Sequence, residues 1–425
     1  MQQIRQNIPE AQRANPFRRA WNHLTDWEKS PVIKTIRGIR ERRIHGLLEE
    51  FKSGGRLIER DPFLGNIVDH GAERKLLKMG KYSVPALNEA LNGSDKALRG
   101  KAARMLGEIE DARALPALIL ALKDDDIHVM TCVRNALAKK GKPAIHALNA
   151  ALGNEDPEIR AHAAWAISGM VFEEKADGLE PTIPALIGLL GDGNHEVRIS
   201  AADALRHVGD SSAIEPLYGL ITGEDSFLLE LRPGEFSELV KNGDPEAGKV
   251  VRARALLMSA MLALSDIAKR HPDHPWEPML PGLMKPLDCN DAWLQQVTAK
   301  ALGTIAESHP EYKWDEAAPK VARTLCVDRG HVVTHAGDAL VKMGMVSVKP
   351  LIFVMNNLHA VGPAGAALKE LSKKHPEEVA AEIIAAVNGK FGEELIAVST
   401  GNGMAVQNLS DILRECGEAM ENAET

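Results

Sequence analysis

Apolar residues recur at steps of three and four along most of this chain, within a phrase that itself repeats. Such spacing places the apolar positions on one face of a helix. A unit that returns roughly every 30–40 residues is typical of helix pairs stacked into a solenoid. One copy of the phrase reads Val197-Arg198, Ala201-Ala202, Leu205, Gly209-Asp210 and Pro216-Leu217, and related copies begin at Leu98-Arg99 and Ile159-Arg160.

Glycine and proline mark the junctions between these units. Gly80 is followed by Pro85, Gly141 by Pro143 and Gly344 by Pro350. Glycine ends a helix readily in a left-handed conformation, and proline fits the first turn of the next helix. The spacing of such prolines predicts a right-handed, all-α solenoid of about eight helix pairs with N- and C-terminal caps.

The pattern divides the chain into segments. We expect a flexible basic arm at 1–29, an amphipathic helix at 30–56, the repeats at 57–380, and a C-terminal helical cap and tail at 381–425. An insert at 222–249 interrupts one unit between its two helices, and Val251-Arg252 restarts the phrase. Insertions in repeat proteins map to loops on one face and often carry function.

The later units share a second phrase. His271-Pro272 precedes Trp276, His309-Pro310 precedes Trp314, and His375-Pro376 repeats the start without the tryptophan. A histidine near a helix C-terminus suits the helix dipole, and proline stops the helix. We therefore interpret the His-Pro pairs as helix ends, and we expect Trp276 and Trp314 to anchor the helices that follow.

The main phrase resembles the HEAT-like repeat superfamily, in particular its short PBS-lyase subtype, across roughly residues 57–380. The resemblance is strongest over 84–217 and weakens after 250, where Trp293-Leu294-Gln295 has no arginine. It implies an architecture of stacked helix pairs. It also implies a structural role for Arg99, Arg160, Arg198 and Arg252, whose guanidinium groups would bind loop carbonyls and the aspartate of a neighbouring turn.

Composition and charge narrow the function. Four cysteines lie far apart without a CxxC pair, and neither a leader peptide nor a membrane span is evident, so a reducing cytoplasm is expected. Residues 1–60 hold 13 Lys or Arg and 7 Asp or Glu, whereas the remainder holds 38 and 52. The acidic body argues against a broad nucleic-acid surface, so nucleic acid is expected only on the arm.

Chemical signatures are weak. The chain has no phosphate-binding loop and no nucleophile elbow, and its one His-Glu pair, His195-Glu196, cannot build a di-iron site. Cys326, His331 and His335 are the remaining metal hypothesis, but no carboxylate lies between the two histidines. We therefore predict no enzyme activity, no cofactor and no resident metal, with a bilin-lyase-like enzyme as the second alternative.

Binding is the function class that this sequence favours. We predict a cytoplasmic scaffold or assembly subunit that holds one or more proteins of a larger complex on its concave face; its oligomeric state stays open. The first alternative is an RNA-associated factor that uses the arm. Aromatic and arginine residues are common interface anchors, and the candidate partner-binding residues are Phe17, Arg18, Arg19, Trp21, Trp27, Phe227, Leu229 and Phe236.

Overall fold

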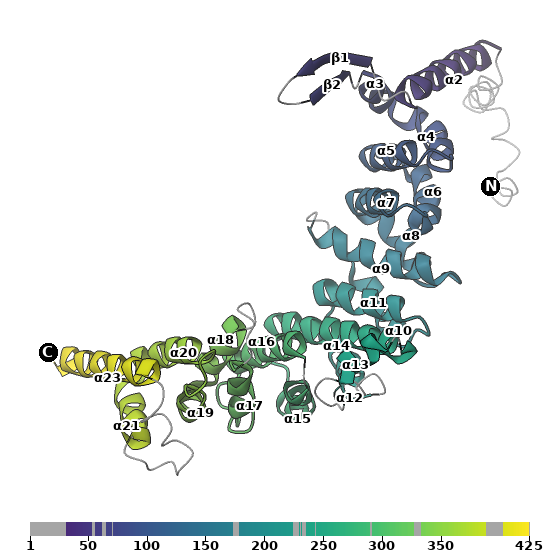
Figure 1. Cartoon of the computed structure of the whole chain (residues 1–425). Coiled ribbons are helices and arrows are strands. Elements are labelled where there is room, and N and C mark those ends of the chain that lie inside the picture. Colours follow the sequence, from purple (N-terminus) through teal and green to yellow (C-terminus); the bar gives the residue numbers. More distant parts are fainter. Residues whose placement is uncertain are drawn as a thin grey trace, which may run out of the picture. The chain divides into compact units, whose positions relative to one another are not determined.

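The computed structural model contains two compact units, Met1–Lys140 (unit 1) and Gly141–Thr425 (unit 2). The residues that it describes are 31–52, 56–61, 65–69, 71–172, 178–223, 229, 231, 235–242, 244–289, 291–326, 333–387 and 403–424. The arm at 1–29 lies outside these ranges. Figure 1 shows the helices in chain order.

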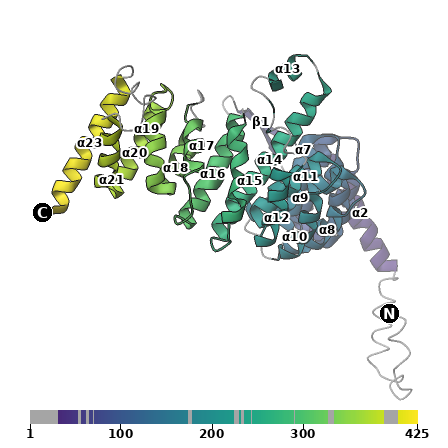
Figure 2. The ribbon, with the colours of Figure 1, turned by 90° about the horizontal axis from the view of Figure 1, so that it is seen from below.

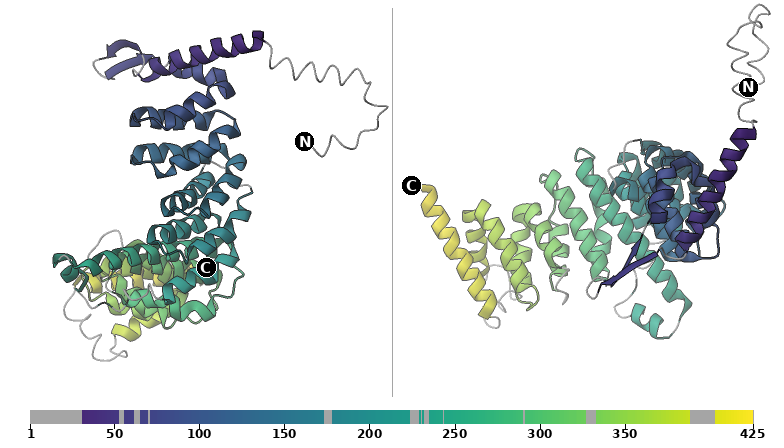
Figure 3. Two further views of the ribbon diagram at one scale, coloured as in Figure 1. Left: turned by 90° about the vertical axis from the view of Figure 1, so that its right-hand side faces the viewer. Right: turned by 90° about the horizontal axis from the view of Figure 1, so that it is seen from above.

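Unit 1 begins with a long helix and a β-hairpin. α2 (Pro31–Lys52) is followed by β1 (Arg56–Asp61) and β2 (Gly65–Asp69), which pair antiparallel with Arg56 opposite Asp69 and an irregularity between Leu57 and Glu59. Both α2 and the hairpin lie at the same end of unit 1 (Figure 3). The helical repeats therefore do not begin at residue 57 as expected.

The hairpin has a local cause. Ile58, Ile67 and Val68 are β-branched residues, which favour extended backbone, and Pro62 disfavours a continuous helix. After the hairpin, unit 1 is helical, with two helix pairs and short 3₁₀ turns. Its elements are α3 (Gly71–Met79), η3 (Gly80–Tyr82), α4 (Val84–Leu91), α5 (Lys96–Glu108), η4 (Ala112–Ala114), α6 (Leu115–Leu120), η5 (Ala121–Lys123) and α7 (Ile127–Lys140).

Unit 2 continues the helix pairs. Within the described residues, eight pairs from α4–α5 to α19–α20 match the predicted number, and the all-α solenoid is confirmed apart from the hairpin. The elements of unit 2 are α8 (Lys142–Leu152), α9 (Pro157–Phe172), η6 (Glu180–Thr182), α10 (Ile183–Leu189), α11 (His195–Val208), η7 (Ser211–Ala213), α12 (Ile214–Thr222), α13 (Glu235–Lys241), α14 (Pro245–Arg270), η9 (Glu277–Met279), α15 (Leu280–Met284), η10 (Lys285–Asp288), α16 (Ala292–Ser308), α17 (Ala317–Thr324), α18 (Val333–Met343), η11 (Gly344–Ser347), α19 (Val348–Val354), α20 (Val361–Lys374), α21 (Pro376–Val387) and α23 (Gly403–Glu424).

Within each unit the second helices of successive pairs stack on one another, and the first helices form a separate row (Figure 1). Small residues allow this close approach. A Cβ atom on Gly107 would lie 2.8 Å from the Cα atom of Ala136, and a Cβ on Gly303 would lie 2.8 Å from the Cα of Ala339. Buried alanines line the remaining contacts, so the second helices form the closely packed spine of each unit.

The predicted glycine junctions are confirmed. Gly80, Gly141 and Gly344 have φ values of 53°, 61° and 77°, in the region that favours glycine. The His-Pro phrases also end helices, because His271, His309 and His375 are the C-caps of α14, α16 and α20. Trp276 and Trp314 are fully buried in the loops that follow.

The insert differs from its predicted form. α14 spans 26 residues, compared with 14 in α11, and begins at Pro245 behind its N-cap Asp244. An ion pair between Arg206 and Asp266 aligns the C-terminal ends of these two helices. The extra length of α14 therefore lies at its N-terminal end, where α13 packs against it (Figure 2). Val251-Arg252 does not begin a new helix, because it lies inside α14.

The C-terminal helix closes unit 2. α23 packs on α20 and α21 and buries Ala405, Leu409, Ile412 and Cys416 along one face. Exposed polar residues such as Gln407 and Glu418 occupy other positions of the helix. The predicted cap at 381–425 thus begins within α21 (Pro376–Val387), while 388–402 lie outside the described residues.

Candidate binding surfaces

The turn inside an early helix pair is held by a single arginine. In unit 1, the Arg99 guanidinium donates to both carboxylate oxygens of Asp124 in the next turn, at 2.7 and 2.8 Å. It also donates to the carbonyls of Gly93 and Ser94 in its own turn, each at 3.2 Å. Burial would raise the pKa of Asp124, but hydrogen bonds from Arg99 and from the backbone outweigh it and lower that pKa.

Arg160 repeats this arrangement in unit 2. It donates to both oxygens of Asp192, at 2.8 and 2.9 Å, and to the carbonyls of Asn154 and Glu155. Asp192 accepts a further bond from the backbone N–H of Asn194. Each of these two arginines thus fastens two successive turns, which is the structural role expected from the family resemblance.

The other two predicted arginines behave differently. Arg198 donates to the carbonyl of Asp192 at 3.2 Å and lies 2.6 Å from Nδ1 of His195. Arg252 forms no ion pair with a carboxylate in the described part of the chain. Arg254 instead pairs with the carboxylate of Asp291, the N-cap of α16.

The spine of second helices presents a common position. On α5, α9, α11 and α16 the residue nine after the capping side chain is at least partly exposed: Arg104 follows Asp95, Trp165 follows Asp156, Asp203 follows Asn194, and Lys300 follows Asp291. Ion pairs connect neighbouring second helices beside this position. They are Glu73–Arg104 and Glu108–Lys139 in unit 1, and Arg206–Asp266, Lys300–Asp266, Glu307–Lys342 and Lys369–Glu415 in unit 2.

Asp203 differs from the charged residues that form these ion pairs. Its carboxyl group is largely buried, and burial raises its pKa although Ser259, Arg206 and His207 act in the opposite direction. Burial likewise lowers the pKa of His207, with the charge of Arg206 adding to the effect. Asp266 has the opposite shift to Asp203, because its bond to Arg206 and the charges of Arg206, Lys300 and Lys269 outweigh the effect of burial and lower its pKa.

Large apolar side chains are exposed on the same second helices of unit 2. Trp165 of α9 is 38% exposed, Val251 of α14 is 51% exposed, and Trp293 of α16 is 44% exposed. Ala255, Met258 and Leu262 continue from Val251 at helical spacing and are half-buried. We call Trp165, Trp293 and the α14 residues Val251, Ala255, Met258 and Leu262 the spine face of unit 2.

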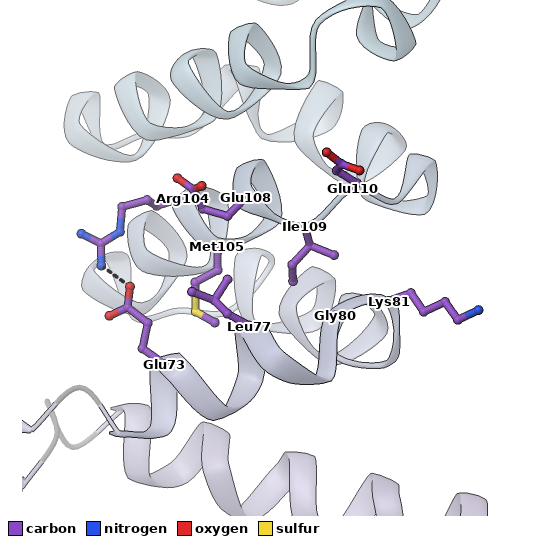
Figure 4. A pocket seen from close by; sticks show the side chains of 9 residues that line it. All are labelled: Glu73, Leu77, Gly80, Lys81, Arg104, Met105, Glu108, Ile109 and Glu110. Atoms are coloured by element: carbon purple, nitrogen blue, oxygen red, sulfur yellow. Dashed lines mark hydrogen bonds and ion pairs between the residues drawn. The ribbon is translucent and has the colours of Figure 1, made fainter.

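Unit 1 has a separate cleft of about 630 Å³ between α3 and α5 (Figure 4). Leu77, Met105 and Ile109 supply its apolar lining, and its polar residues include Glu108 and Glu110. Glu73 and Arg104 close one side with an ion pair of 2.8 Å, whereas Lys81 points away on the other side (Figure 4).

Most of the predicted partner-binding residues lie outside the described ranges. These are Phe17, Arg18, Arg19, Trp21, Trp27 and Phe227. Leu229 is half-buried, and Phe236 belongs to α13, although its side chain lies outside the description. His331, one of the three residues proposed to bind a metal, also lies outside the described ranges. The described residues contain no group of three His, Cys, Asp or Glu that could hold a metal ion.

The repeat is also recognised in sequence. A family model of HEAT repeats matches residues 84–168 and 146–230. Residues 84–230 are therefore HEAT repeats. The match does not distinguish the PBS-lyase subtype, which stays a prediction, and no curated protein matches this sequence.

Solved structures of other solenoids resemble the chain in architecture. Importin beta is 16% identical, with a TM-score of 0.48 over 90% of this chain and 54% of its own. Kap95 in its complex with Nup1 is 15% identical, with a TM-score of 0.47 over 94% of this chain and 53% of its own. This chain thus spans about half the length of either protein. A designed armadillo repeat protein bound to the peptide (KR)4 is 20% identical, with a TM-score of 0.37 over 54% of this chain and 99% of its own.

The residues of the spine face were not predicted from the sequence. Trp165 and Trp293 stand within the repeat phrase, where an aromatic residue is first interpreted as part of the core. Their position relative to the helix N-caps is the signal that could have found them. Asp156 precedes Trp165 by nine residues and Asp291 precedes Trp293 by two, and both spacings place the tryptophan away from the buried side of its helix.

Proposed function

We propose that this chain is a non-catalytic, protein-binding scaffold or assembly subunit that works in the cytoplasm. The observation that carries the proposal is the spine face of unit 2, where two exposed tryptophans and an apolar row on α14 lie among inter-helix ion pairs. Exposed apolar clusters with a polar surround are typical of protein-binding sites. Tryptophan is also the residue type most enriched among interface residues that dominate affinity.

Two further features support this proposal. A stack of helix pairs offers an extended surface rather than an enclosed pocket, which suits a helix or an extended segment of a partner. In addition, Cys132, Cys289, Cys326 and Cys416 are all free, as expected in a reducing compartment.

In the described part of the chain no helix has the length and apolar character that crossing a bilayer requires. The prediction that a partner lies on the concave face remains part of the proposal.

The test is affinity capture from native lysate with the full-length chain and two variants. The double variant Trp165→Ala and Trp293→Ala removes both anchors of the spine face. Phe353→Ala is the matched control, because Phe353 is 43% exposed but belongs to the first helix α19. We expect one stoichiometric partner that the control retains and the double variant loses. Equal capture by all three proteins would overturn the assignment to the spine face.

A further inference from the structure

An exposed tyrosine lies between cations at the start of unit 1. Tyr82 ends η3 and is 48% exposed. The guanidinium carbon of Arg40, on α2, lies 3.8 Å from the centroid of its ring, and the Nζ atom of Lys81 lies 5.6 Å from it. One aromatic ring therefore joins a basic helix to the first turn of the repeats.

The basic side chains around this ring form a row. Arg37, Arg40 and Arg43 follow one another at three-residue steps along α2, with Arg37 and Arg43 exposed and Arg40 half-buried beside Tyr82. Within the residues that the structure describes, neither Arg37 nor Arg43 pairs with a carboxylate. Glu41 lies on α2 within this stretch, and Glu110 lines the same cleft as Lys81. Asp111 is also close, but it pairs with Arg113, which donates to the carbonyl of Lys81.

We propose that Arg37, Arg40, Arg43, Lys81 and Tyr82 form a binding surface for single-stranded nucleic acid. The arginines would bind successive phosphates through charge-assisted hydrogen bonds. A base would stack on the exposed Tyr82–Arg40 pair, since unstacked bases pack on aromatic rings and on guanidinium planes. This function goes beyond protein binding, and it occupies described residues of unit 1 rather than the arm.

The surroundings favour this ligand over other polyanions. An anionic membrane would be bound by an amphipathic helix that inserts its apolar face, but α2 buries Ile44, Leu47 and Leu48. A duplex keeps its bases stacked and would leave the Tyr82 ring unused. Beyond residue 60 the chain is acidic overall, with 52 Asp or Glu against 38 Lys or Arg, which disfavours a broad phosphate-binding surface there.

The test uses fluorescence anisotropy of the full-length protein with short oligouridine and oligothymidine probes. The double variant Arg37→Gln and Arg43→Gln should weaken binding about tenfold and reduce the slope of log Kd against log salt by about 1.4, as expected for two lost phosphate contacts. Tyr82→Ala should weaken binding roughly tenfold, whereas Tyr82→Phe keeps the ring and should keep the affinity. Comparing the two probes shows whether RNA or DNA is preferred.

Arg323→Gln is the matched control, because Arg323 is an exposed arginine at the end of α17 in unit 2. It should leave both affinity and salt slope unchanged. Circular dichroism must show the same helix content for every variant, because Arg40 also packs α2 against Tyr82. The proposal is overturned if no oligonucleotide binds, if Arg323→Gln weakens binding as much as the α2 variants, or if the protein binds only phosphatidylserine vesicles.

Discussion

In pair α8–α9 a guanidinium holds the turn between the two helices, whereas in pair α15–α16 a neutral amide holds that turn and a buried indole anchors the loop that leads to the next pair. Arg160 joins the carbonyls of Asn154 and Glu155 to the carboxylate of Asp192. At the same position of α16, Gln295 donates to the carbonyls of Leu287 and Cys289. The loop after α16 is anchored by Trp314, whose indole N–H donates to the carbonyl of His309 at 3.1 Å.

The two pairs thus differ in how the connections of their helices are fixed. An arginine–aspartate pair is directional and sets the register of neighbouring repeats, but its net contribution is reduced by the desolvation of both charges. A buried tryptophan contributes through apolar area, which is larger and depends little on salt. Unit 2 therefore provides both solutions within one stack, and the substitutions below test how far they differ.

The largest effect is expected at the buried indoles. Trp314→Ala removes a fully buried side chain and should lower the free energy of unfolding by about 3–5 kcal/mol. Trp314→Phe also removes the hydrogen bond to His309, whereas Nε1 of Trp276 has no hydrogen-bond partner among the described residues. Thermal melts should therefore show a larger loss for Trp314→Phe than for Trp276→Phe, and the reverse order would contradict this account.

The close approach of the second helices predicts the next effect. Gly303→Ala places a Cβ atom 2.8 Å from the Cα of Ala339, and it should cost about 1–2 kcal/mol even though alanine favours the helix. Gly337→Ala, on the neighbouring helix α18, meets no atom within 4 Å and should be neutral or stabilising. Chemical denaturation of the two variants measures this contrast, and equal midpoints would disprove tight packing of the spine at α16–α18.

Breaking the arginine turn should cost less. Arg160→Met introduces the residue that α7 has at the equivalent position, Met130, and should lower stability at neutral pH by about 1 kcal/mol. The pKa of Asp192 is lowered: burial alone would raise it, but the bonds from Arg160 and Asn194 outweigh burial. This contribution is present above the unfolded pKa and is lost as the pH falls through the folded one. The variant and the parent should therefore converge in acid, as melts across pH would show.

The smallest effect should have the opposite dependence on pH. Asp203 has a raised pKa because its carboxyl group is buried, so its charged form costs stability above the folded pKa. Asp203→Asn should raise the free energy of unfolding at pH 7 by about 0.5 kcal/mol. Below the unfolded pKa of aspartate the gain should vanish, because the carboxyl group is then neutral in both states. A gain that grows in acid would rule out this assignment.

Local chemistry made part of the fold predictable. The left-handed junctions at Gly80, Gly141 and Gly344 and the helix ends at His271, His309 and His375 depend on a few adjacent residues, and all six are confirmed. The hairpin at 56–69 was missed because its apolar residues fit a helical face as well as a strand. The start of α14 was missed because Val251-Arg252 imitates a helix beginning inside a continuous helix.

The candidate sites were less predictable than the fold. The distance from the helix N-cap is the one sequence signal for Trp165 and Trp293, and Tyr82 has none. Exposure itself depends on which side of the helix a neighbouring repeat covers. The partner of Asp291 was also out of reach. Arg252 and Arg254 are two residues apart, and only the alignment of α11, α14 and α16 decides which of them meets that carboxylate.

The sequence by itself determined the repeating helix pair, its glycine and proline junctions and its capping residues, because each depends on backbone preferences and spacing within a few turns. The tertiary structure alone decided the register between repeats, and with it which charges pair, which tryptophans are buried and which remain exposed on the spine face. These outcomes follow from packing between residues about 30 or more positions apart, where a shift of a single helical turn exchanges one set of neighbours for another.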